Sequence, residues 1–128
     1  MLPVQLANLW AAWIGIAIGM AGGAIAGLCF HRTEWLGGYG SWPRRLVRLG
    51  HISFFGLAFI NFAFVFTADR VTAAPPPEFV TASSLLIVGA ITMPLVCFAA
   101  AWRPVCRHAF FIPVGCLLTA VILVLKGL

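Results

Sequence analysis

Apolar residues along the chain fall into four long runs, separated by polar and turn-forming residues. The runs cover Leu6–Phe30, Leu46–Thr67, Thr81–Ala101 and Val105–Leu125. A helix of about 20 residues, rising 1.5 Å at each residue, crosses roughly 30 Å of hydrocarbon. Each run therefore predicts one membrane-spanning helix, and together they predict an all-α, four-helix transmembrane bundle in up-down order.

The composition is typical of a protein that lies in lipid rather than in water. Of the 128 residues, 62% are hydrophobic and 9% are charged, whereas a soluble domain usually carries about 25% charged residues. The four runs leave little of the chain outside the bilayer. We therefore expect residues 1–128 to form a single transmembrane domain.

The basic residues indicate how the helices are oriented. Six of the eight Lys and Arg residues lie in or beside the first and third connections, at Arg32, Arg44, Arg45, Arg48, Arg103 and Arg107. Short loops rich in Lys and Arg stay on the cytoplasmic side, so both termini are expected on the outer side. The net charge of +5 follows from this topology, and no nucleic-acid partner is expected. The expected location is a bacterial inner (plasma) membrane.

Prolines and one serine mark local features of the predicted helices. Ser41 and Pro43 are suited to the N-cap and the first turn of the second helix. Pro94 and Pro113 lie inside the third and fourth runs, where proline removes a backbone hydrogen bond and is expected to kink a helix. The stretch TAAPPPEF, Thr72–Phe79, is expected to form a stiff connection on the outer side.

Small residues at four-residue intervals form the strongest pattern in the first helix. The row comprises Ala7, Ala11, Gly15, Gly19, Gly23 and Gly27. Residues four apart lie on nearly one helix face, and missing side chains let another helix approach closely. Three interpretations are open: packing on the second or fourth helix of this chain, association with another chain, or a groove for a flat cofactor.

The three histidines all map to the cytoplasmic end of the predicted bundle. His31 ends the first helix, His51 lies near the start of the second, and His108 lies in the first turn of the fourth. Helical bundles build haem and metal sites from facing side chains, and neutral imidazole is a common ligand. His51 and His108 could ligate a b-type haem, and all three could hold a metal ion with Glu34 or Cys29, or a quinone-type ligand. They could equally be interfacial histidines that bond to water, lipid or backbone.

Other polar residues have simpler expected roles. Arg44, Arg48 and Arg107 would contact anionic lipid headgroups, or the propionates of a bound haem. Asn61 and Thr92 lie at mid-membrane depth, where a hydrogen bond between helices would contribute about 0.6 kcal/mol.

Catalytic patterns are absent from the sequence. It has no paired carboxylates, no HExxH and no GxSxG motif, and no charged residue at mid-membrane depth, where ion and proton paths place such groups. We therefore expect a non-enzymatic membrane protein that works by helix association, as an accessory subunit of a membrane complex or as a homo-oligomer. The alternative is a redox protein that binds a b-type haem or a metal at the histidine end.

Overall fold

The computed structural model describes residues 3–71 and 76–128, and all regular elements in these ranges are helical. They are α1 (Pro3–Cys29), η1 (Trp35–Gly37), α2 (Trp42–Val71), α3 (Pro77–Trp102), η2 (Pro104–Phe110) and α4 (Phe111–Gly127), where η denotes a 3-10 helix. Four stretches are long and apolar enough to cross a membrane, namely Gln5–Cys29, Trp42–Val71, Pro77–Trp102 and Pro104–Gly127. The prediction of four apolar, membrane-length helices is confirmed.

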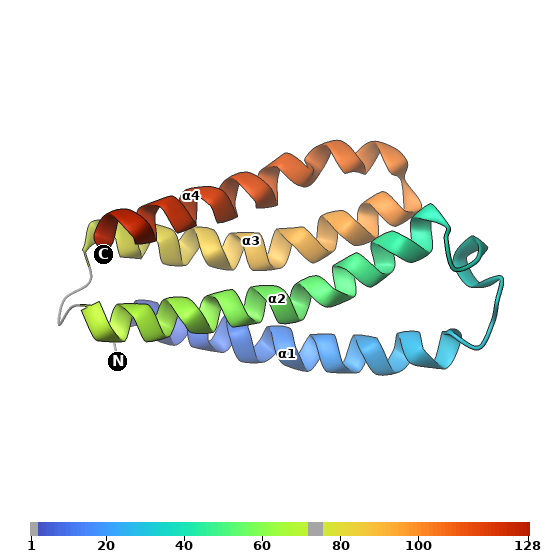
Figure 1. Ribbon diagram of the computed structural model, residues 1–128, viewed down its shortest axis with the longest axis horizontal. Coiled ribbons are helices and arrows are strands. Elements are labelled where there is room, and N and C mark those ends of the chain that lie inside the picture. The colour runs from blue at the N-terminus through green and yellow to red at the C-terminus, as the bar shows by residue number, and fades with distance from the viewer. Residues whose placement is uncertain (1–2, 72–75) are drawn as a thin grey trace.

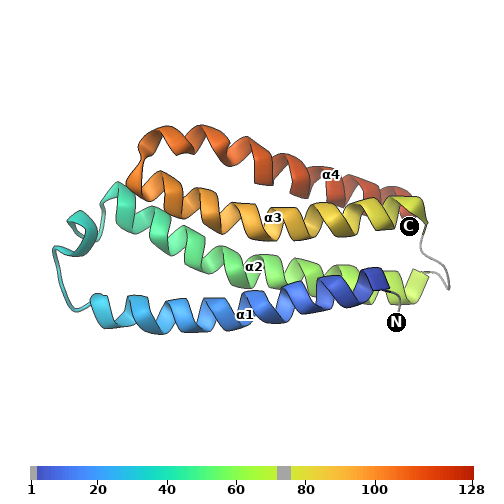
Figure 2. The same cartoon turned by 180° about the vertical axis from the view of Figure 1, so that it is seen from behind.

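The helices lie side by side in chain order, with α2 and α3 in the middle and α1 and α4 at the edges (Figure 1). Figure 2 shows the same order from behind, with the start of α1 crossing α2. Both labelled termini lie at one end of the molecule. In the most apolar stretch of α2 and of α3, 33% of the residues are buried, against 11% in α1 and in α4. The arrangement is therefore open, because each edge helix leaves most of its surface uncovered.

The hydrophobic core belongs mainly to α2, α3 and α4. At the end that holds the termini, Phe64 and Ala68 of α2 pack with residues of α3 and with Ala120 of α4. At the other end, Leu46 of α2 packs with the last alanines of α3. The close approach of α3 and α4 depends on Gly89, where an added Cβ would lie 2.5 Å from a methyl carbon of Leu117. α1 contributes little apolar side-chain burial to this core.

α2 begins four residues earlier than the apolar run, at Trp42. The hydroxyl of Ser41 accepts a hydrogen bond from the backbone N–H of Arg44 (3.3 Å), and Pro43 lies in the first turn. This is the geometry of an N-cap, because Ser41 satisfies an N–H that has no partner within the helix. The predicted roles of Ser41 and Pro43 are confirmed.

α4 begins later than the apolar run predicts. The predicted helix starts at Val105, but Pro104–Phe110 form the 3-10 helix η2, and α4 starts at Phe111. Pro113 has no N–H to donate to the carbonyl of Ala109, so the α-helical ladder is interrupted at this residue. Pro113 consequently lies in the first turn of α4 rather than in its interior. Pro94 lies within α3, which continues through it from Pro77 to Trp102.

The connection between α2 and α3 is only partly described. Residues 72–75 of the expected stiff connection lie outside the described residues. Pro76 is extended (φ −62°, ψ 155°), and Pro77 occupies the first position of α3, where a missing N–H does not weaken the helix.

Candidate functional site

The row of small residues on α1 winds around the helix and meets different surroundings along its length. Gly19 lies where an added Cβ would be 2.9 Å from the ring of Phe55, and at Gly23 it would be 2.6 Å from Nε2 of His51. At Gly27, nothing lies within 4 Å. Four residues advance a helix by about 400°, so successive members of the row turn by about 40°. One row therefore cannot face a single partner, and its middle part packs on α2.

His51 is built into this contact between α1 and α2. Its Nε2–H donates a hydrogen bond to the backbone carbonyl of Gly19 (2.9 Å). Its ring lies edge-on to Phe55, with the ring centres 5.5 Å apart. The missing side chain of Gly23 leaves the space that the imidazole fills. His51 thus joins two helices, because its Nε2–H is engaged by the backbone carbonyl of Gly19.

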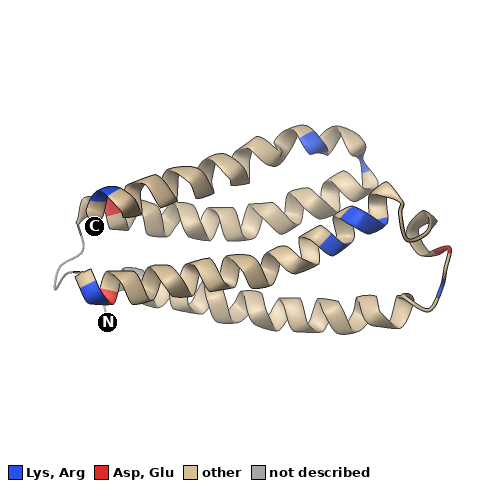
Figure 3. Ribbon diagram, in the orientation of Figure 1, with Lys and Arg blue, Asp and Glu red and all other residues tan. Residues whose placement is uncertain are grey.

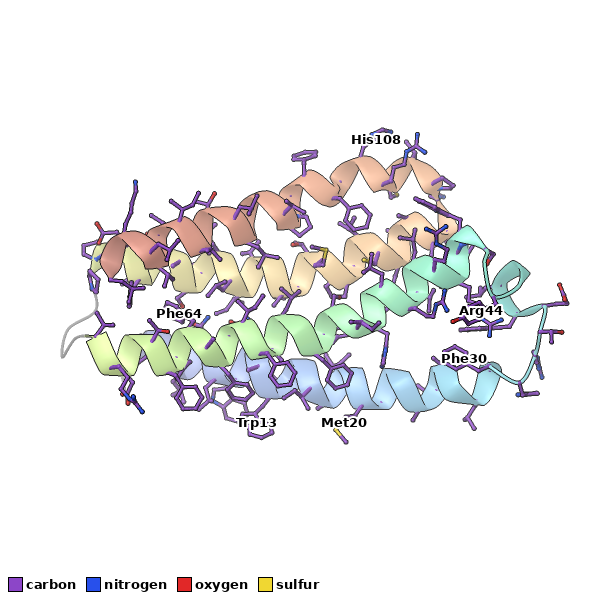
Figure 4. The ribbon with its side chains drawn as sticks, viewed as in Figure 1. Trp13, Met20, Phe30, Arg44, Phe64 and His108 are labelled. Atoms are coloured by element: carbon purple, nitrogen blue, oxygen red, sulfur yellow. The ribbon has the colours of Figure 1, made fainter. Side chains whose placement is uncertain are left out.

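The structure does not bring the three histidines together. Nδ1 of His31 is 2.8 Å from the carbonyl oxygen of Leu28, one turn earlier in its own helix. His108 is exposed in η2 and points away from the other helices (Figure 4). Among the described residues there is no group of three or more His, Cys, Asp or Glu side chains that could hold a metal ion. The expected sites on His31, His51 and His108, with Glu34 or Cys29, are not assembled in this arrangement.

A buried polar cluster connects α1, α2 and α3 at the end that holds the termini. The side-chain amide of Asn8 donates to Oδ1 of Asn61 (2.7 Å) and to the backbone carbonyl of Ser83 (3.3 Å), and the hydroxyl of Ser83 donates to Oδ1 of Asn8. Asn8 and Asn61 are fully buried. Asn61 is paired across helices as predicted, but with Asn8, whereas the hydroxyl of Thr92 donates to the carbonyl of Val88 in its own helix.

The pattern of apolar residues did not predict the hydrogen bonds that Asn8 makes to other helices. The available signal was that the chain has only two asparagines, Asn8 and Asn61, both inside apolar runs. A lone amide in an apolar helix costs free energy unless it has a hydrogen-bond partner. Two such amides on different helices are therefore natural partners.

Arg44 lies inside the protein rather than at a lipid headgroup. The side chain is buried, and its guanidinium carbon lies 5.4–5.6 Å from the ring centres of Phe30, Trp35 and Tyr39 (Figure 4). It donates a hydrogen bond to the backbone carbonyl of Thr33 (3.3 Å). These contacts are cation–π and polar interactions that hold the connection between α1 and α2 onto the first turn of α2.

Arg48 and Arg107 differ from Arg44 in their exposure. Arg48 is half-buried, its guanidinium carbon lies 4.3 Å from the ring centre of Tyr39, and it donates to the Tyr39 carbonyl (3.3 Å). Arg107 is exposed in η2. Of the three arginines expected at lipid headgroups, these two remain where headgroups can reach them.

An apolar groove of about 610 Å³ lies between α1 and α3, with α2 as its floor. Small residues line much of it, including Ala7, Ala11 and Gly15 of α1, Ala58 of α2 and Ala90 of α3. These α1 residues are the first half of the row of small residues, and Gly15 also lies against α2, where an added Cβ would be 3.4 Å from the backbone oxygen of Phe54. Its rim includes Trp10 and Ile14, which are 62% and 51% exposed.

Four apolar, membrane-length helices define the class of this protein as helical and integral to a membrane. Comparison with known proteins finds no matching family model, no matching characterised protein and no matching solved structure.

Proposed function

We propose that this chain is a small, non-enzymatic integral membrane protein that works by helix association, as an accessory subunit of a membrane complex or as a homo-oligomer. The observation that supports the proposal most directly is the apolar groove between α1 and α3. Its occupant would be a transmembrane helix of a second chain, either another subunit or another copy.

Small side chains make the groove suited to a helix. Lipid gives little hydrophobic drive for helix association, so transmembrane helices associate through close van der Waals packing, which small residues permit. Ala7, Ala11 and Ala90 would let a partner backbone approach closely, while Trp10 and Ile14 at the rim would cover its sides. The open arrangement adds support, because α1 buries only 11% of its most apolar stretch within the chain.

The distribution of charge supports an orientation with both termini outside the cytoplasm. Figure 3 shows that charged residues gather at the two ends of the helices and leave the middle free. Arg44, Arg45 and Arg48 lie near the start of α2, and Arg107 lies in η2, both at the end opposite the termini. Under the rule that Lys- and Arg-rich loops stay cytoplasmic, that end faces the cytoplasm of the proposed bacterial inner membrane. No geometric observation favours the haem alternative, since His51 points to α1 and His108 points away from the bundle.

Filling the groove should test the proposal. In Ala11→Leu and Ala90→Leu, the added side chains would occupy the space that a partner backbone needs. Overpacking of this kind usually costs about 1–3 kcal/mol, so the association constant should fall about 5- to 150-fold and the associated fraction with it. Crosslinking in native membranes, followed by native mass spectrometry of the purified protein, measures that fraction and identifies the partner.

Two exposed alanines outside the groove provide matched controls. Ala24→Leu on α1 and Ala99→Leu on α3 make the same chemical change at exposed positions that do not line the groove. Both should associate like the wild type. If the groove variants fold normally by circular dichroism and associate as well as these controls, the proposal is wrong.

A further inference from the structure

A second hollow, of about 480 Å³, lies on the outward face of α2 near its start. It is lined only by residues of α2: Trp42, Arg45, Leu46, Arg48, Leu49 and Ile52. Two guanidinium groups thus stand beside an indole and a set of branched aliphatic side chains. The lining contains no acidic residue, so its electrostatic potential favours an anion.

The position of this hollow along α2 matches the boundary between headgroups and hydrocarbon. The stretch from Leu49 to Ala68 contains no charged residue and, at 1.5 Å per residue, is about 30 Å long, which is the thickness of the hydrocarbon core. Arg48 comes directly before this stretch, and Arg45 lies nearly one turn farther out. The arginines consequently lie at the depth of lipid phosphates, while Leu49 and Ile52 lie at the depth of the first acyl carbons.

Two of the residues in the lining are held in place by the rest of the protein. The ring and the backbone carbonyl of Tyr39 contact the guanidinium of Arg48, and the guanidinium of Arg44 lies near the same Tyr39 ring. The indole N–H of Trp42 donates to the carbonyl of Ala100 on α3 (3.1 Å). Because these side chains are already ordered, a ligand would lose less conformational entropy on binding them.

We infer that this hollow binds one anionic phospholipid, whose phosphate contacts Arg45 and Arg48 and whose acyl chain follows Leu49 and Ile52. A guanidinium pairs with phosphate oxygens through two parallel hydrogen bonds. A zwitterionic lipid fits less well, because its own cationic group would lie near two arginines. The site is separate from the groove between α1 and α3, so it does not depend on the proposed association.

Lipid selectivity tests this site directly. The wild-type protein, in bilayers of equal parts phosphatidylglycerol and phosphatidylcholine, should retain phosphatidylglycerol preferentially when native mass spectrometry counts the bound lipids. The double variant Arg45→Gln/Arg48→Gln should bind phosphatidylglycerol about 30-fold more weakly, since each basic side chain near a membrane surface contributes about 1 kcal/mol, which is about fivefold in affinity.

A matched control has the same change in charge at the same end of the molecule. Arg32 and Arg103 are exposed, and Arg32→Gln/Arg103→Gln should retain phosphatidylglycerol within about twofold of the wild type. An equal loss in both double variants would mean that the attraction is diffuse and would overturn the site. So would a wild-type protein that retains the two lipids equally, in which case the hollow is better assigned to an acidic segment of a partner. Thermal unfolding of all variants distinguishes loss of the site from loss of the fold.

Discussion

At the scale of single residues, Asn8 joins α1 to two other helices through its side chain. Its side chain is fully buried, and its amide bonds to residues of two other helices. No water is present in the hydrocarbon to replace such partners. Because α1 adds few apolar side chains to the core, Asn8 fixes the rotation of α1 and its register against α2 and α3.

Replacing Asn8 should therefore loosen α1. In Asn8→Leu, the amide of Asn61 and the hydroxyl of Ser83 lose their partner, and we expect a loss of about 1–3 kcal/mol in the free energy of unfolding. Unfolding in a mixed-detergent titration measures this loss. In a double-mutant cycle, the destabilisation of Asn8→Ala/Asn61→Ala should be smaller than the sum of the two single variants by about 0.6 kcal/mol or more. Strictly additive effects would contradict the proposed role.

The sequence predicts the contacts of these buried polar residues only in part. It indicated that Asn61 needs a partner, but hydropathy does not report how a helix is rotated, so Asn8 and the inward position of Arg44 were missed. Aromatic residues that surround Arg44 come from the connection at Phe30, Trp35 and Tyr39. Their contribution depends on how that connection folds back, which a pattern of apolar residues does not show.

At the scale of elements, the contact between α1 and α2 depends on only part of the glycine row. Gly23 leaves room for His51, whereas Gly27 has no neighbour within 4 Å. The two glycines are one turn apart on the same helix and share the same intrinsic helix propensity. Substituting each of them therefore distinguishes an effect on packing between helices from an effect on helix propensity alone.

Substituting these two glycines should give different results. Gly23→Leu would displace His51 and remove its hydrogen bond to Gly19, so we expect a destabilisation of about 1–3 kcal/mol. Gly27→Leu should change stability by no more than about 0.5 kcal/mol, because it adds an apolar side chain on an open surface. Thermal unfolding monitored by circular dichroism compares the two. Equal destabilisation would show that α1 and α2 do not pack in this way.

The number and approximate spans of the helices could be predicted from sequence because burial in lipid requires long apolar runs. Their ends depended on local chemistry: Ser41 extends α2 to Trp42, and Pro113 delays α4 to Phe111. The partner of the glycine row could not be chosen from spacing alone. Packing on α2, packing on α4 and association with another chain all use the same small residues.

At the scale of the whole molecule, the proposed orientation is open to a direct test. A reporter enzyme that is active only outside the cytoplasm should be active when fused after Leu128. The same reporter inserted beside Gly40, in the connection between α1 and α2, should be inactive, because the arginine-rich end is expected in the cytoplasm. The reverse result at both positions would show that the orientation is opposite to the proposed one, and it would place the proposed lipid site in the outer leaflet.

The hydrogen bonds between Asn8 and the other helices also have a consequence for synthesis of the protein. Its partners Asn61 and Ser83 lie 53 and 75 residues later in the chain. At a translation rate of about 5–20 residues per second, α1 waits roughly 4–15 s before α3 has been made. Until Asn61 has been made, the amide of Asn8 has no native partner within the nascent chain, so newly made α1 depends on the insertion machinery or on lipid headgroups. Within this cluster the last bonds to form join the first helix to the third, so the cluster is complete only after Ser83 has been made.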